Sequence, residues 1–282
     1  MTKGMNCVCC DAEMNLFSKN SYLNLPVYVC SGCKTHQTGN SYTITKEKTE
    51  ELYKKAYWDE RDSENSLNSD YTDIDSQGKK RRWISQYKYA QRFFPSERKL
   101  LEIGTGAGQS LFWFEEKGCD VTGIEPDKRN VDMINKKLIK GKCFEGYAEN
   151  FELKEVFDII WISHVFEHVL EPEKVLRKLR LMIRKSGILF IEVPNCENKQ
   201  TLHDSVYDNP STYHFSKNGL LSLAEKADYD ILACDYFRSP TKAEGIINRV
   251  IGNVSSLNPY KFYPKILCDN RGTDIRLILK AN

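Results

Sequence analysis

"LLEIGTGAGQSLFWFEEKGCDVTGIEPD", from Leu100 to Asp127, is the stretch that decides the fold. It contains an apolar strand, a glycine-rich loop, a helical pattern and a second apolar strand. In open α/β sheets, ligands bind beyond the carboxyl ends of such strands, and glycine lets the backbone approach them closely. We therefore expect a nucleoside site, with Glu102 and the loop at one end and Glu125 at the other.

The spacing of the glycines distinguishes between two kinds of nucleoside ligand that such a loop can bind. Gly104, Gly106 and Gly108 form G-x-G-x-G, whereas a dinucleotide fingerprint requires glycine at the position of Gln109. An acid two residues before the loop suits a cationic ammonium group. These features favour a nucleoside that carries an amino acid, and NAD binding by a dehydrogenase is the alternative.

The regions around this stretch alternate between strand and helix patterns. They predict a doubly wound α/β, mostly parallel seven-stranded sheet, Rossmann-like, closed by an antiparallel pair. A helix with an apolar face is expected over 79–94, ended by Pro95. The expected strands lie near 100–103, 121–124, 142–146, 157–162, 187–193, 228–239 and 273–281, and the expected helices near 108–117, 128–139, 172–184 and 217–227.

Composition limits the partners. The 282-residue chain has 41 Lys and Arg against 39 Asp and Glu, and its only dense basic run is "KKRR" at 79–82. This near-equal number of basic and acidic residues argues against an extended nucleic-acid-binding surface, which must neutralise many phosphates. The chain shows no signal-peptide pattern and no apolar run of spanning length, so we expect a cytoplasmic protein without membrane insertion. The oligomeric state stays open.

Two C-x-x-C pairs near the N-terminus, Cys7/Cys10 and Cys30/Cys33, need a separate explanation. Each pair can offer two thiolates to one tetrahedral ion, which predicts a small zinc ribbon with structural zinc. Disulfides or free cysteines are the alternatives. We expect three parts: a zinc ribbon over 1–45, a helical or mobile lid and linker over 46–95, and the α/β domain over 96–282.

The motifs together resemble the class I S-adenosylmethionine-dependent methyltransferases. The resemblance rests on "LLEIGTGAG", "GIEPD", "FDIIWISHVFEHVLEPEKVLRKLRLMIRKSGILFIEVPN" and "YHFSKNGLLSLAEKA" over roughly residues 80–240. It implies that the methionine part contacts Glu102, Gly104, Thr105 and Gly106, the ribose Glu125, and the adenine Pro126. Tyr147 stands where the family often has an acid, so the remaining adenine contact is expected from Ala148 or Glu149.

Candidate catalytic residues follow the fourth strand in "SHVFEH", where Ser163 is expected beside the cofactor. If this segment forms a helical turn, His164 and His168 share one face, and either can act as a general base. The alternative is that Glu167 and His168 only order the turn. A divalent metal held by His164, Glu167 and His168 is less favoured, because adjacent residues on one helix do not all converge on one ion. His214 is a further candidate near the mouth.

A zinc ribbon before such a domain resembles two groups: bacterial methyltransferases of sugar and polysaccharide pathways, and ribosomal-RNA guanine methyltransferases. The charge balance favours the first. We expect O-methylation of a sugar hydroxyl, in a nucleotide sugar or a surface polysaccharide. The alternatives are rRNA base methylation, O-methylation of a small phenol and, last, a non-enzymatic cofactor-binding scaffold.

Overall fold

The computed structural model of the protein describes residues 5–39, 77–238, 243–244, 246–247 and 265–281. The expected lid aromatics Tyr53, Tyr57 and Trp58 lie outside the described residues.

A sheet of eight strands forms the centre, in the order β11-β10-β12-β8-β7-β4-β5-β6. The five strands from β4 to β8 are parallel to one another, and β12 pairs antiparallel with both β8 and β10. This confirms the doubly wound, mostly parallel fold, and β11 adds one short strand to the seven expected. The bounds are β4 Lys99–Ile103, β5 Asp120–Glu125, β6 Lys142–Glu145, β7 Phe157–Ser163, β8 Ile183–Pro194, β10 Tyr229–Arg238, β11 Lys265–Leu267 and β12 Asp274–Ala281.

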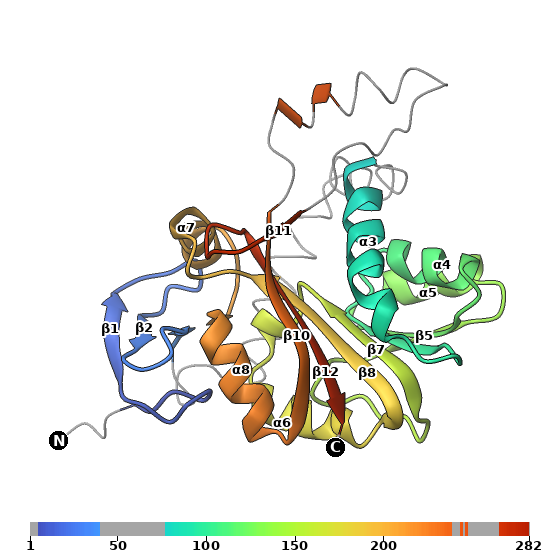
Figure 1. The fold of residues 1–282 in the computed structure, drawn as a ribbon, viewed down its shortest axis with the longest axis horizontal. Helices are drawn as coiled ribbons and strands as arrows, with labels where there is room; N and C mark the ends of the chain where they lie inside the picture. Colours follow the sequence, from blue (N-terminus) through green and yellow to red (C-terminus); the bar gives the residue numbers. More distant parts are fainter. Residues whose placement is uncertain (1–4, 40–76, 239–242, 245, 248–264, 282) are drawn as a thin grey trace.

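Helices cover both faces of the sheet (Figure 1), because the central strands are apolar on both sides. Leu100 belongs to the core under α3, α4 and α5, and the next residue, Leu101, belongs to the core under α6 and α8. The bounds are α3 Gln77–Ala90, α4 Gln109–Glu116, α5 Lys128–Lys137, α6 Pro172–Arg180, α7 Lys199–Tyr207 and α8 Lys217–Lys226. A 3-10 turn, η3 Gln91–Phe93, continues α3 up to Pro95.

The expected helix over 172–184 is too long. Helix α6 ends at Arg180, and the carbonyl of Met182 already accepts a hydrogen bond from the backbone N–H of Phe157 in β7. The backbone therefore joins the sheet before the predicted end of the helix, and β8 starts at Ile183.

The N-terminal cysteine module, residues 5–39, is joined to the α/β domain through a second sheet. Its strands β1 Met14–Ser18, β2 Val27–Cys30 and β3 His36–Thr38 continue into β9 Tyr213–His214. His36 pairs with His214, and Gln37 pairs with Tyr213. The segment before α8 thus serves as the fourth strand of the module's sheet.

Candidate active site

The glycine loop between β4 and α4 has the conformation its composition predicts. Gly104, Gly106 and Gly108 all have positive φ, between 54° and 77°, a region that side chains rarely adopt. A Cβ at Gly104 would lie 2.2 Å from Cγ2 of Val165, so the loop packs directly on the turn after β7. A Cβ at Gly106 would meet no described atom within 4 Å. Gly106 therefore leaves room for close approach of a ligand.

Glu102 is buried at the end of β4, before this loop. Its Oε1 accepts a hydrogen bond from the Ser110 hydroxyl, whereas its buried Oε2 has no partner among the described residues. Burial raises the pKa of Glu102 to about 8. A buried carboxylate oxygen without a partner is costly unless a donor or cation approaches it. The ammonium group of an amino-acid-bearing nucleoside meets that requirement.

Glu125, at the end of β5, is the second buried acid. It accepts hydrogen bonds from the backbone N–H groups of Gly106, at 2.8 Å, and Asp127, at 3.1 Å. Burial raises its pKa to about 7, although these bonds act in the opposite direction. The side chain of Asn130 is a further hydrogen-bond partner. A carboxylate has about four acceptor positions, so Glu125 keeps capacity for a ribose hydroxyl.

The other expected cofactor residues lie near this loop or are engaged within the protein. The hydroxyl of buried Thr105 lies 3.8 Å from Sγ of Cys143, inside the protein. A contact between Thr105 and the cofactor would therefore come from its backbone. Pro126 follows Glu125 and is half-buried. Buried Ala148 precedes Glu149, whose carboxylate accepts from the N–H of Leu170. Ser163 accepts a hydrogen bond from Gln86 of α3. Their cofactor contacts stay predictions.

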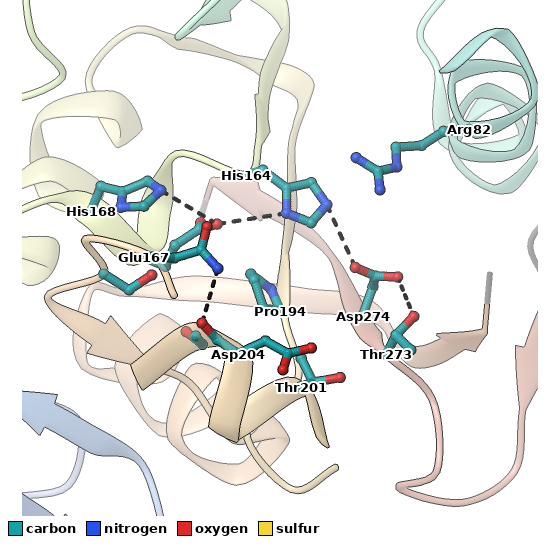
Figure 2. A pocket seen from close by; sticks show the side chains of 12 residues that line it. Arg82, His164, Glu167, His168, Pro194, Thr201, Asp204, Thr273 and Asp274 are labelled. Atoms are coloured by element: carbon teal, nitrogen blue, oxygen red, sulfur yellow. Dashed lines mark hydrogen bonds and ion pairs between the residues drawn. The ribbon is translucent and has the colours of Figure 1, made fainter. Parts of the chain in front are cut away.

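The turn after β7 is not the α-helical turn considered from the sequence. His164 has φ 54°, in the left-handed region, and only Phe166–His168 form a short 3-10 turn, η4. Strained backbone of this kind gathers at functional sites. The turn places Glu167 between the two histidines: its Oε1 lies 3.6 Å from Nδ1 of His164 and 3.8 Å from Nε2 of His168 (Figure 2).

The two histidines differ in protonation. Burial alone lowers the pKa of His164, but the carboxylates of Glu167 and Glu192 raise it to about 10, so this ring is a cation at neutral pH. Burial lowers the pKa of His168 below its ordinary value despite the charge of Glu167. His168 is therefore neutral at pH 7, the state that a general base requires.

A pocket of about 590 Å³ opens beside this turn. Figure 2 shows side chains converging on it from the turn, from α7, from the start of β12 and from α3. Among the lining residues, Pro194 alone has an apolar side chain. The pocket is lined by Arg82, His164, Glu167, His168, Pro194, Thr201, Asp204, Ser205, Asn209, Ser211, Thr273 and Asp274.

Sequence reasoning missed a buried ion pair beside this pocket. Glu192 of β8 and Arg276 of β12 form an ion pair in which each side chain is 1% exposed. Glu192 also accepts a hydrogen bond of 2.6 Å from Gln86 of α3. A charged residue within each of two apolar strands was the available signal, because such residues are buried only when paired.

The residues placed to surround a cation also differ from the set that the sequence suggested, which was His164, Glu167 and His168. His164, Glu192 and Asp274 bring one ligand atom each within 4.8 Å. However, Glu192 is already bonded to Arg276 and Gln86, and the charge of Arg82 acts on all three members of the group. These positive charges oppose a divalent cation.

His214 lies at the contact between the cysteine module and the α/β domain. It is 2% exposed, with Nε2 3.0 Å from the Thr38 hydroxyl and Nδ1 2.7 Å from the Ser205 hydroxyl. Burial lowers its pKa to about 3. Because both ring nitrogens are hydrogen-bonded inside the protein, we leave His214 out of the proposed catalytic group. It supports Ser205, which does line the pocket.

The four expected cysteines converge in the N-terminal module. The sulfur atoms of Cys7, Cys10, Cys30 and Cys33 lie within 4.8 Å of one another. Cys7 and Cys33 are 3.7 Å apart and Cys10 and Cys30 are 3.4 Å apart at sulfur. Tetrahedral zinc with Zn–S bonds of about 2.3 Å places its sulfurs roughly 3.8 Å apart. The arrangement therefore fits a structural metal site.

Comparison with known proteins gives one family. Residues 76–233 match the family model described as a methyltransferase domain. A solved S-adenosylmethionine-dependent methyltransferase from Archaeoglobus fulgidus has a similar fold, with a TM-score of 0.51 and 19% identity, over 70% of this chain and 91% of that chain.

Two curated relatives are similar over shorter regions. One is a ubiquinone biosynthesis O-methyltransferase from Pelagibacter ubique, 30% identical over 34% of this chain and 42% of the relative. The other is a thiol S-methyltransferase from Rattus norvegicus, 28% identical over 40% of this chain and 49% of the relative. The chain thus spans less than half the length of each of these relatives. No described helix is long and apolar enough to span a bilayer.

Proposed function

The chain belongs to the class I S-adenosylmethionine-dependent methyltransferases, and from this we propose that it methylates a hydroxyl group of a sugar, in a nucleotide sugar or a surface polysaccharide. The domain is an enzyme of the methyltransferase class with the fold of its solved relatives. The sugar acceptor and the roles of individual residues are the proposal.

The polar lining of the pocket is the observation that carries this proposal. Eleven of its twelve lining residues can donate or accept hydrogen bonds through their side chains. A sugar presents hydroxyl groups in several directions and needs such partners, whereas phenol sites are mostly apolar. The pocket also adjoins the cofactor loop, because Gly104 packs against Val165 of the His164–His168 turn.

The cofactor fits the buried acids of the loop. Glu102 would hold the ammonium group through its unpartnered Oε2, and Glu125 would hold the ribose hydroxyls. When bound, S-adenosylmethionine supplies an activated methyl group on a sulfonium. The protein then has to align the acceptor hydroxyl, exclude water and remove one proton.

His168 is the proposed base. Its Nδ1 lies 3.3 Å from the carbonyl oxygen of Pro210 and would donate to it, so Nε2 is the proposed proton acceptor. Glu167, 3.8 Å from Nε2, would stabilise the imidazolium that forms after proton transfer. His164 is already a cation and is proposed to orient Glu167 and the acceptor.

We also propose a structural zinc ion bound by Cys7, Cys10, Cys30 and Cys33. The mutual distances of the four sulfurs support it. Because β3 of the same module pairs with β9, such an ion would stabilise the pocket wall formed by Ser205 and Ser211.

The deciding experiment is a turnover screen with purified full-length protein and S-adenosylmethionine. The acceptor panel contains nucleotide sugars, oligosaccharides, phenols, thiols and ribosomal RNA. Thiols are included because one curated relative is named a thiol S-methyltransferase, and phenols because they are the alternative class of O-methyl acceptor. Transfer to a sugar hydroxyl, identified by mass spectrometry, supports the proposal. Transfer to RNA, a phenol or a thiol with none to sugars rejects it, and cofactor binding without turnover on any class favours a scaffold.

A further inference from the structure

Arg82 enters the acceptor pocket from α3, on the side opposite α7. Figure 2 shows its guanidinium group directed toward His164 and Asp274. The side chain lines the pocket but forms no hydrogen bond or ion pair with another residue of the part of the chain that the structure describes. The exposed guanidinium group faces the pocket and is thus placed to meet an anion from outside.

The acids near Arg82 are engaged with other groups. Glu192 pairs with Arg276. Glu167 lies between His164 and His168. Asp274 lies 3.5 Å from Nε2 of His164 and accepts a hydrogen bond from the Thr273 hydroxyl.

Asp204, on the α7 side of the pocket, accepts a hydrogen bond from Gln200 and lies 3.5 Å from the ring of His203. Glu192 has Arg276 as a cation of its own, whereas Glu167 and Asp274 share the ring of His164. The charge of Arg82 acts on Glu192 and Asp274 without a hydrogen bond to either, so its guanidinium N–H groups are open to a ligand.

We propose that Arg82 binds an anionic group, a phosphate or a carboxylate, that is part of the acceptor. This inference rests on the proposed sugar methylation and deepens it: the acceptor is a sugar phosphate, a nucleotide sugar or an acidic sugar, and not a neutral one. The planar guanidinium fork matches both oxyanions through paired hydrogen bonds. The acceptor would lie with its anion at Arg82 and its reacting hydroxyl at His168.

The test measures binding and turnover separately, on the full chain with S-adenosylhomocysteine present for the binding arm. Glucose 1-phosphate, glucuronate and glucose are the three probes, since they share a ring and differ in charge. We expect at least one anion to bind about 10-fold or more tightly than glucose, with the preference weakened by added salt. The anion that is preferred identifies phosphate or carboxylate as the group recognised.

Arg82→Ala should abolish this preference, and Arg82→Lys should retain part of it, because lysine keeps the charge but loses the fork. Lys88→Ala is the matched control, a cation on the same helix outside the pocket lining. Glucose binding should be the same in all three variants.

The inference is overturned if neither anion binds better than glucose, or if Arg82→Ala keeps the preference. The proposed function fails in a different way. Arg82-dependent anion binding without methyl transfer to any sugar would reject sugar methylation and keep the anion site.

Discussion

The Nδ1 atom of His168 lies 3.3 Å from the carbonyl oxygen of Pro210. A carbonyl oxygen only accepts hydrogen bonds, so Nδ1 carries the proton and Nε2 carries the lone pair. This relationship defines which nitrogen of the ring can receive a proton from an acceptor hydroxyl.

The first prediction concerns His168 itself. His168→Asn can still donate toward Pro210 but lacks the basic Nε2, so kcat should fall by about 10²-fold or more while the Kd for S-adenosylmethionine stays unchanged. His203→Asn, on α7 outside the pocket lining, is the control and should retain full activity. Full turnover by His168→Asn, measured with the acceptor from the screen, would show that positioning alone suffices.

The pH profile of kcat should reflect the lowered pKa of His168. The neutral ring is the active form, so activity should persist at neutral pH and decline only below about 6.5, the ordinary histidine value. A single acid limb is expected, and His168→Asn should remove it. If the rate instead falls from pH 10 toward pH 8, the base is a group with a raised pKa, such as His164.

Cofactor binding should release a proton at pH 7. Glu102 has a pKa of about 8 in the unliganded protein and is then mostly protonated. A bound ammonium group favours the carboxylate, so its pKa falls and the proton leaves. Affinity should therefore rise with pH up to about 8, where the free protein itself loses this proton. Calorimetry in buffers of different ionisation enthalpy measures the release, which Glu102→Gln should reduce; an unchanged release would exclude Glu102 as its source.

Glu125→Ala should weaken S-adenosylmethionine binding by about 10-fold or more, because the charge-assisted hydrogen bonding to the ribose is lost. Glu145→Ala is a matched control: Glu145 pairs with Glu125 across β5 and β6 but is exposed. Circular dichroism checks that both variants are folded. Equal affinity in the Glu125 variant would remove the ribose assignment.

Metal analysis should find about one zinc per chain, and Cys7→Ser with Cys30→Ser should lose it. Cys9→Ala should retain it, since Cys9 lies in the same loop but outside the proposed ligand set. The double variant should lose acceptor turnover more than cofactor binding, because the pairing of β3 with β9 holds the acceptor side of the site. A fully loaded double variant would disprove this ligand set.

Local patterns in the sequence were enough to determine the α/β fold and to predict the residues of the cofactor site. Apolar runs define the strands, and the glycines at 104, 106 and 108 adopt positive φ as their loop requires. Glu102, Glu125 and the four cysteines were likewise identifiable from spacing. Each of these features depends on residues close to one another in the chain, so each is visible without a structure.

The partners and the protonation of the residues at the proposed acceptor pocket, in contrast, depend on the tertiary structure. Glu192 meets Arg276 from 84 residues away, and His214 meets Thr38 across 176 residues. The sequence offered His164 and His168 as alternative bases and His214 as a further candidate near the mouth. Burial and distant partners then distinguished them: the pKa of His164 is raised, that of His168 is lowered, and His214 is a buried contact. Protonation depends on the charges and the water that surround a ring in space, and that environment arises only when distant strands pair.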